Sequence, residues 1–455
     1  MKKFLALLLC IALIVSMSLT AAGEGEATES GDSKVLEVWS FTRELNTAAL
    51  AFEKLNPGVT INYTEIPMNG GEYQTKVLAA AQTKDVPDVV ALEAAFVREW
   101  IESDFLMDIS DLEPKAKELG VYQNVLDVGT YDGEIRGYSY QSTPGAVFYR
   151  RSLAKEYFGT DDPVKIQAMM SDMDGFREMA KVIKEKSNGN TYIVPSTGDF
   201  TNAYYANREQ PWVVDGTLTL DPMVHELMAV AKEFRQEGYE AQATQWSEGW
   251  FAGMNDTLKD AAGDAKQVFC YFLPTWGLSY TLAPNAPDTA GDWACVNGPL
   301  PYQWGGTWVG AMKDSDNVDL AKAFVEFCTL NEEHLTNWAT GVYTNDFLKA
   351  IDPEIGDLAQ AAGDFTCSKV VNEKIEPLFD DSAITGFLAG QNSYGGFMKA
   401  APTISARLMQ GTDDAIQRCF NDPLEGYVSG ETTKEECLDA FKLLLGSELP
   451  DIKVK

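Results

Sequence analysis

Aromatic side chains are the groups of this chain best suited to bind a ligand, with 10 tryptophans, 18 tyrosines and 22 phenylalanines. Aromatic faces stack on the apolar side of a sugar ring, and planar polar side chains beside them can hydrogen-bond to adjacent hydroxyl groups. Several aromatics are predicted to follow strands, where parallel sheets place ligands. The candidates are Trp39, Phe41 and Arg43 after the first strand, Glu93 and Phe96 after the third, Trp276 and Trp308 at glycine-containing turns, and Tyr394 in a C-terminal loop.

A structural role competes with ligand binding at each of these positions. Trp39 alternates in step with its strand, so burial in the core explains it equally well. The polar groups of Arg43 and Glu93 could instead order their loops. Trp246 and Trp250 could form a second aromatic platform, although the Ser-Glu-Gly sequence between them disfavours a helix.

Residues for enzymatic chemistry are sparse. The only two histidines, His225 and His334, lie in helical patterns without HExxH spacing, and the chain has no GxSxG turn and no glycine-rich phosphate loop with lysine. A pair of carboxylates, as in glycoside hydrolases, stays open because 68 acidic residues allow many pairs. The segment 314–319 lacks the glycine and the final glutamate of a calcium loop. We therefore expect no catalytic residue, no metal and no cofactor.

The net charge of −32 excludes whole classes of partner. Nucleic acids, polyanionic ligands and anionic membrane surfaces all require basic protein surface, which this composition does not provide. A strongly acidic surface also keeps a protein soluble, and this is the simplest interpretation of the charge.

The first 22 residues have the layout of a secretory signal peptide, with Lys2 and Lys3 followed by a short apolar run and small residues. Residues 23–33 are rich in Gly, Glu, Ser and Thr, which predicts a flexible tether. We therefore expect an exported protein at the cell surface. A lipid anchor is doubtful, because Ala22 occupies the position at which a lipobox requires cysteine.

Apolar periodicity predicts an α/β fold. Strands are expected at 35–39, 59–63 and 86–92, with helices between them, and this β-α-β-α-β order is typical of a parallel sheet covered by helices. Further helices are predicted at 222–238, 321–330 and after Thr433, where Thr433 and Glu436 form a capping box. The DGEIRGYSY hairpin is followed by a break at Pro144-Gly145 and then by an apolar run of strand length, 146–149. This stretch could end one sheet and begin another.

Several phrases resemble the extracellular solute-binding proteins of ABC transporters, specifically the maltose-binding-protein-like family 1 group. They are VWSF, FEKLNPGV, PDVVALEAAFVREWIESDFLMDISDL, the DGEIRGYSY hairpin, the LPTWG turn and the GGTWVG strand, and they occur in the order typical of that family. The resemblance implies a two-lobed periplasmic-binding-protein-like fold of type II, with a mostly parallel sheet in each lobe and three crossings at the hinge. It assigns 34–142 and 309–350 to an N-terminal lobe, and 143–308 and 351–455 to a C-terminal lobe.

The resemblance also implies a function. Such a protein would be the carbohydrate-binding component of an importer, with an oligosaccharide as the expected ligand, membrane permease subunits as partners and a monomeric state. It further implies ligand contacts for Trp276, Trp308 and Tyr394. The alternatives are a non-sugar solute, such as a peptide or polyamine, and a secreted glycan-active hydrolase.

Six cysteines remain after export, and none forms a CxxC pair of the kind that zinc sites use. We predict that Asp422-Pro423 ends a helix and that the next begins at Thr433, so that two adjacent antiparallel helices bring Cys419 near Cys437. A disulfide between them is one expectation, and two buried free thiols are the other.

Overall fold

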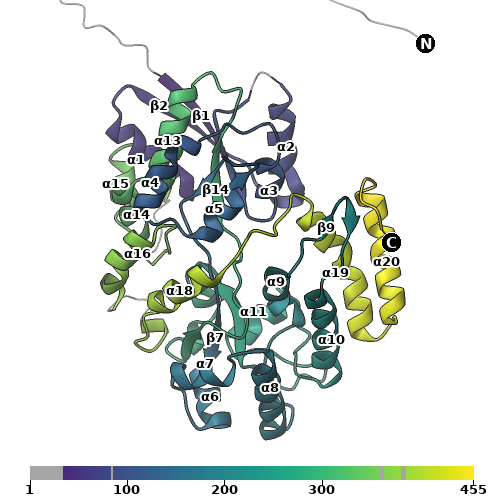
Figure 1. Ribbon diagram of the computed structural model, residues 1–455. Helices are drawn as coiled ribbons and strands as arrows, with labels where there is room; N and C mark the ends of the chain where they lie inside the picture. Colours follow the sequence, from purple (N-terminus) through teal and green to yellow (C-terminus); the bar gives the residue numbers. More distant parts are fainter. Residues whose placement is uncertain (1–33, 84–85, 358–362, 381–385, 455) are drawn as a thin grey trace, which may run out of the picture.

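The computed structural model describes residues 34–83, 86–357, 363–380 and 386–454. The predicted signal peptide and tether lie outside these residues. The described chain forms two lobes, each built around one main sheet, with the first lobe above the second in the view of Figure 1. This is the mixed α/β two-lobed fold that the sequence predicted.

The first lobe contains a five-stranded sheet in the order β2-β1-β3-β14-β6. Its strands are β1 (Lys34–Ser40), β2 (Val59–Glu65), β3 (Val89–Glu93), β6 (Tyr138–Ser139) and β14 (Thr307–Ala311), and the pair β4 (Thr130–Tyr131) and β5 (Glu134–Ile135) forms a hairpin beside it. Its helices are α1 (Glu44–Leu55), α2 (Glu72–Ala81), α3 (Val97–Ile101), α4 (Glu113–Glu118), α5 (Gln123–Gly129), α13 (Val318–Leu330), α14 (Glu332–Ala339), α15 (Asn345–Lys349) and α16 (Lys369–Ile375).

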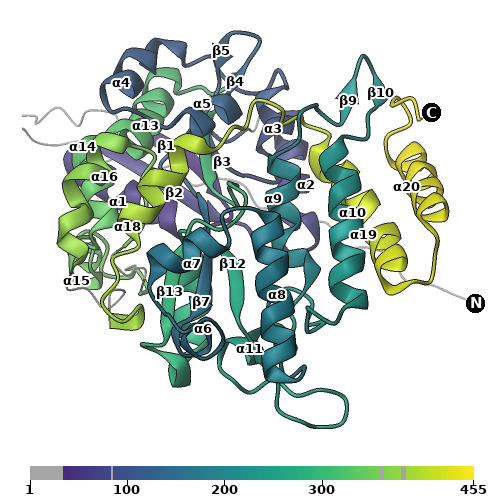
Figure 2. The ribbon, with the colours of Figure 1, turned by 60° about the horizontal axis from the view of Figure 1, so that its bottom comes forward.

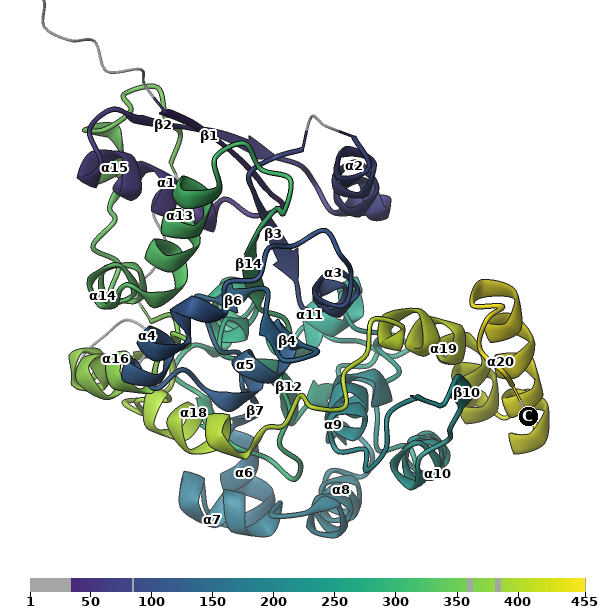
Figure 3. The same ribbon diagram turned by 45° about the horizontal axis from the view of Figure 1, so that its top comes forward.

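The parallel strands of the first sheet follow from the predicted pattern. β1 pairs in parallel with both β2 and β3, and α1 and α2 make the crossovers that parallel strands require. The first four residues of β3 are buried, which explains its continuous apolar run. α1 turns an apolar face inward, where Phe52 contacts Phe324 and Phe327 of α13. Figure 3 shows α1, α13 and α14 on one side of this sheet and α2 and α3 on the other.

The second lobe is built on the three-stranded sheet β12-β7-β13. Its strands are β7 (Gly145–Arg150), β8 (Thr191–Tyr192), β9 (Val213–Val214), β10 (Thr217–Leu218), β11 (Gln267–Val268), β12 (Cys270–Pro274) and β13 (Trp293–Val296). Its helices are α6 (Arg151–Phe158), α7 (Pro163–Met169), α8 (Met173–Ser187), α9 (Thr201–Ala206), α10 (Pro222–Gln236), α11 (Glu248–Met254), α12 (Ala283–Asn285), α18 (Tyr394–Ala400), α19 (Asp413–Ser429) and α20 (Lys434–Glu448). Figure 2 shows α8, α9, α10, α19 and α20 side by side on one flank of this sheet.

The second sheet corrects the expectation of a mostly parallel sheet in each lobe. β7 pairs antiparallel with both β12 and β13, and among the named strands of the described part of this lobe only β8 and β11 pair in parallel. The physical reason lies in the crossings. β7 runs away from the hinge, whereas β13 runs back toward it, because the chain returns to the first lobe just after β13. The register pairs Pro274, at the end of β12, with Gly145, so the turn after β12 also faces the first lobe.

The first two crossings lie beside each other and form the hinge, which we define as residues 140–144 and 297–306. The Thr143 hydroxyl donates to the Gly305 carbonyl over 2.8 Å, and the Trp304 amide donates to the Thr143 carbonyl over 3.1 Å. Gly305 and Gly306 have φ values of +74° and +115°, which glycine adopts without strain. The hinge is therefore a hydrogen-bonded pair of extended segments.

The third crossing lies later than the predicted position near residue 350. α16 still packs against α14 of the first lobe, where Lys374 pairs with Glu332 over 2.8 Å. Phe365, just before α16, contacts Tyr394 and Phe397 of α18, and α18 packs against β7 of the second lobe. The sequence pattern does not report this, because α15 and α16 are short helices of five and seven residues.

A further segment, 401–412, returns to the first lobe on its way from α18 to α19 (Figure 1). We call it the strap. The Ala406 amide donates to Asp127 over 3.3 Å, and the Gly411 amide donates to Glu102 over 3.1 Å, both in the first lobe. On the other side, the Gln410 side chain makes two hydrogen bonds to the backbone of Val213. The strap is thus attached to both lobes.

The predicted disulfide is not formed, since Cys419 and Cys437 are both free thiols. The reason is that α19 does not end at Asp422-Pro423 but continues through Pro423 to Ser429, and Gly430 ends it in the left-handed conformation. Cys437 is instead buried in the core of the second lobe, as a small apolar group. The capping box of Thr433 and Glu436 is confirmed at the start of α20.

The hinge glycine gives the first testable prediction. A Cβ on Gly305 would lie 3.0 Å from the indole nitrogen of Trp276, whereas a Cβ on Gly263, also at positive φ, would contact nothing within 4 Å. We expect G263A to cost about 1 kcal/mol of unfolding free energy for its backbone conformation alone, and G305A to cost clearly more. Urea denaturation of both variants measures this, and equal losses would show that the hinge tolerates a side chain beside Trp276.

Candidate functional site

The candidate site is the cleft between the lobes, where strand ends of both sheets meet. From the first lobe, the loop after β1 and the end of β3 reach the cleft, and β14 begins beside β3 with Thr307 opposite Glu93. From the second lobe, the turn after β12 reaches it. A cavity of about 610 Å³ lies there, which is within the range of small-molecule sites. Its charged and aromatic lining residues are Phe41, Arg43, Glu44, Glu65, Glu93, Trp246, Trp276 and Tyr280. We call this space the aromatic compartment.

Three tryptophans from separate segments form one cluster in the second-lobe wall of the aromatic compartment. The rings of Trp246 and Trp276 are nearly parallel, with an angle of 8° between planes and 6.5 Å between centroids. Trp304 meets both of them edge to face, at 5.8 Å and 5.4 Å. The indole N–H of Trp276 donates to the Trp304 carbonyl over 3.0 Å, which fixes that ring to the hinge. The result is a rigid apolar surface with its polar edge already satisfied.

Trp246 is exposed in a way that is unusual for tryptophan. Half of the residue's surface is accessible, and its backbone has a φ of +67°, a conformation that non-glycine residues rarely adopt. Behind it, Trp250 is fully buried and donates its indole N–H to Asp199 over 3.0 Å. Backbone strain and an exposed indole both cost stability, and such costs concentrate at binding sites.

The first-lobe wall combines an aromatic ring with carboxylates. Phe41 is half-buried and meets Tyr73 and Phe96 edge to face behind it. Glu44 accepts hydrogen bonds from two tyrosine hydroxyls, that of Tyr140 over 2.5 Å and that of Tyr280 over 3.1 Å. Because Tyr280 belongs to the second lobe, this last bond joins the two lobes across the cleft.

Glu93 is the titratable group at the centre of the cleft. Burial, reinforced by the charge of Asp414, raises its pKa from 4.5 to about 7, while the backbone amides of Ala95 and Ala94 limit the rise. The Ala95 amide holds the carboxylate over 2.7 Å. A carboxyl group that is partly protonated near neutral pH can both donate and accept hydrogen bonds, as neighbouring hydroxyls of a ligand require.

The structure brings together four of the predicted site residues. Phe41, Arg43, Glu93 and Trp276 all line the aromatic compartment, and the sequence placed each of them just after a strand. Arg43 is paired there with Glu65 over 3.3 Å, and both side chains are exposed. Trp246, which sequence reasoning held as a second platform with Trp250, joins Trp276 in the same wall.

The other four predicted residues lie in the protein interior or against it. Trp308 is 2% exposed and donates its indole N–H to the Val125 carbonyl, which corrects the expected ligand contact. Tyr394 is 3% exposed and bonds the Asp364 carbonyl through its hydroxyl. Phe96 and Trp39 pack in the core of the first lobe. Trp39 and Trp308 lie within strands of the first sheet, and Phe96 and Tyr394 lie at the starts of α3 and α18, so a position near a turn did not expose them.

Sequence reasoning missed Glu44, Glu65, Tyr280 and Trp304. Trp304 immediately precedes Gly305-Gly306, and this aromatic–glycine pattern was a usable signal. Tyr280 lies in a π-helix, Leu278–Leu282, and π-helical turns often mark functional sites, but the sequence shows no sign of one. Among the described residues, no three metal-binding side chains are grouped closely enough to hold an ion.

The raised pKa of Glu93 predicts a pH dependence of stability. The folded protein holds this proton up to about pH 7, whereas the unfolded chain releases it near 4.5. The contribution of Glu93 to stability is therefore fully present below pH 4.5 and is lost as the pH rises to about 7. The E93Q variant lacks this titration. We therefore expect the unfolding free energy of E93Q minus that of wild type to be larger at pH 8 than at pH 4.5, by on the order of 2 kcal/mol.

Denaturation midpoints of wild type and E93Q at several pH values test this expectation. Exposed Glu431 serves as the control, since E431Q should change the denaturation midpoint by the same amount at every pH. A difference between wild type and E93Q that does not change with pH would contradict the buried environment of Glu93.

Comparison with known proteins agrees with this arrangement. The chain matches the model of the bacterial extracellular solute-binding protein family over residues 39–334, whereas no curated protein sequence matches it. A solved extracellular solute-binding protein of family 1 has a TM-score of 0.72 at 16% identity, with 92% of this chain and 100% of that one covered.

Two similar structures are those of proteins described as binding sugars. The galacto-N-biose-/lacto-N-biose I-binding protein of a Bifidobacterium longum ABC transporter, in complex with lacto-N-biose, has a TM-score of 0.67 at 13% identity, covering 94% of this chain and 100% of that one. The sugar-binding protein MalE of Xanthomonas citri has a TM-score of 0.66 at 16% identity, covering 92% and 97%. At such low identities the likeness is one of fold.

The family consists of transport binding proteins rather than enzymes. In the described part of the chain, every helix is too short or too polar to cross a bilayer. The matched residues include both sheets and nearly all of the aromatic compartment, and they make up more than half of the chain. The chain therefore belongs to the bacterial extracellular solute-binding protein family.

Proposed function

We propose that this solute-binding protein captures a carbohydrate, most simply an oligosaccharide, in the interlobe cleft and delivers it to the permease of an ABC transporter. The observation that carries the proposal is the nearly parallel pair of indoles, exposed Trp246 and half-buried Trp276, which line the cleft together with carboxylates of the first lobe. Flat apolar faces opposite hydrogen-bonding groups suit a pyranose, which has an apolar face and a rim of hydroxyls. Two proteins of the same fold, one in complex with lacto-N-biose and one described as sugar-binding, support the choice.

Lobe closure would couple binding to transport. A ligand that touches both lobes stabilises the closed arrangement by the difference between its affinities for the two states. Here the second lobe supplies the indoles, and the first supplies Glu44, Glu65 and Glu93. The permease would then recognise the closed protein as a monomer at the outer face of the membrane, with export directed by the predicted signal peptide. No bond is made or broken in this cycle.

A cationic solute such as a polyamine is a second candidate, favoured by the charge of the cleft. Three carboxylates line the aromatic compartment, and the one cation among its lining residues, Arg43, is already paired with Glu65. Carboxylates and indole faces together can hold an ammonium group through charge and cation–π attraction. A thermal-shift screen against neutral saccharides and against putrescine and spermidine separates the two candidates, because a ligand at 100 times its Kd adds about 2.7 kcal/mol of stability.

The indole pair gives the mutational test. W246A and W276A should each weaken saccharide binding by about 1–3 kcal/mol, the loss expected when an anchoring aromatic is removed. The control is Y131A, which removes an exposed aromatic from the β4–β5 hairpin, outside the cleft. Calorimetric titration measures the affinities. Normal binding by both tryptophan variants would exclude the indole pair as the ligand platform.

A further inference from the structure

The cleft continues beyond the aromatic compartment into a second space, and we propose that this space binds an additional neutral, hydroxyl-bearing unit of a longer saccharide. This proposal rests on the proposed carbohydrate function. The second space has a volume of about 300 Å³. It shares the lining residues Glu93 and Gly305 with the aromatic compartment, and it is also lined by Trp304, which contacts Trp276 in the tryptophan wall. We call it the amide compartment, after Asn202, Gln303 and Gln417 in its lining.

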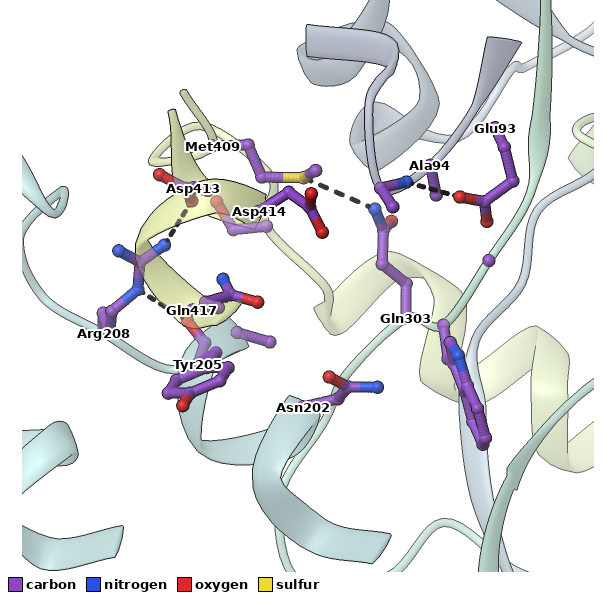
Figure 4. A pocket seen from close by; sticks show the side chains of 15 residues that line it. Glu93, Ala94, Asn202, Tyr205, Arg208, Gln303, Met409, Asp413, Asp414 and Gln417 are labelled. Carbon is purple, nitrogen blue, oxygen red and sulfur yellow. Dashed lines mark hydrogen bonds and ion pairs between the residues drawn. The ribbon is translucent and has the colours of Figure 1, made fainter. Parts of the chain in front are cut away.

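Four polar side chains from three different segments converge on the amide compartment. Figure 4 shows Asn202, Gln303, Asp414 and Gln417 directing their polar ends into the same space. Asn202 comes from α9, Gln303 from the hinge, and Asp414 and Gln417 from the first turns of α19. Side chains that are distant in sequence thus surround one cavity, as binding sites require.

Two of these groups are fixed and two are free to bind. The Gln303 carbonyl accepts from the Asn124 amide over 2.7 Å, and Asp414 is paired with Arg418. In contrast, the side-chain amides of Asn202 and Gln417 have no hydrogen-bond partner among the described residues, although both are half-buried. An amide that is partly removed from water and unpaired gains free energy when a ligand satisfies it.

The chemistry of the lining selects a neutral, hydroxylated ligand. Each amide offers both a donor and an acceptor, and a sugar hydroxyl is also both, so adjacent hydroxyls can bond to Asn202 and Gln417 together. The compartment has one cation of its own, Arg208, which is buried and paired with Asp413 over 2.7 Å. Asp414 is likewise paired with Arg418, so the described lining residues offer no unpaired cation to the anionic group of a uronic acid or a sulfated sugar.

The position of the compartment explains why it would serve a longer ligand. Trp304 lines the amide compartment and contacts both indoles of the aromatic compartment edge to face, so it stands between the two spaces. Ser405 and Met409 of the strap close the far side. A short saccharide stacked on Trp246 and Trp276 leaves the amide compartment unused, whereas a longer one extends past Trp304 into it.

The experiment compares affinities along ladders of chain length. Calorimetry is carried out with neutral α- and β-linked gluco-oligosaccharides and β-linked galacto-oligosaccharides of two to five units, on wild type and on the double variant N202A/Q417A. We expect wild-type affinity to rise about tenfold or more beyond the disaccharide, and the double variant to lose this rise while keeping its disaccharide affinity. Q82A, an exposed amide at the end of α2, is the control and should behave as wild type.

Each result has one meaning. If N202A/Q417A affects all chain lengths equally, or none, while W246A still weakens binding, the amide compartment is not a ligand site and the proposed function stands. If no saccharide binds to wild type, both proposals fail. Should the double variant fold poorly, as judged by urea denaturation, Q417A alone is used, since Gln417 lies on the surface of α19 and makes no bond within the described structure.

Discussion

Exposed indole surface between two lobes is the constraint on which this structure depends. Trp246 leaves half of its surface accessible, at a strained backbone position, and it lies parallel to Trp276. The hydrophobic effect alone would bury such rings in either lobe, as it buries Trp250 behind them. Keeping them accessible requires a rigid framework, which the second lobe provides through β12, α11 and the hinge.

The hinge connects this surface to the rest of the molecule. Trp304 belongs to the hinge segment and accepts the indole hydrogen bond of Trp276, while Thr143 of the other crossing bonds to the adjacent Gly305. Any rotation of one lobe against the other therefore moves the aromatic wall relative to Glu44 and Glu93. The strap, attached to both lobes, limits that rotation on the side of the amide compartment. A ligand held between the aromatic wall and the first lobe would therefore couple binding to lobe motion.

The sequence predicted the first lobe well because its signals are local. Alternating apolar residues in β1 and β2, the buried run of β3 and the intervening amphipathic helices all reflect short-range periodicity. Phe41, Arg43, Glu93 and Trp276 were placed in the site because the ends of strands in both sheets point at the hinge. The antiparallel second sheet and the late third crossing were missed, since strand direction and docking of short helices depend on contacts distant in sequence.

The errors in the candidate site have the same origin. Trp304 and Trp308 are four residues apart beside the same glycines, yet Trp308 is in the core and Trp304 borders the cleft. All residues of β14 are buried, so its alternation does not show which side faces a ligand. Tyr280 and Glu44 meet only because the two lobes face each other, which no pattern within either segment reports.

The most direct test of this account is a crystal structure of the mature protein with the saccharide that stabilises it most in the thermal-shift screen. The account predicts a sugar ring within about 4 Å of the Trp246 or Trp276 face, with hydroxyls bonded to Glu44 or Glu93. A saccharide bound elsewhere on the molecule, with both indoles still facing solvent, would contradict it.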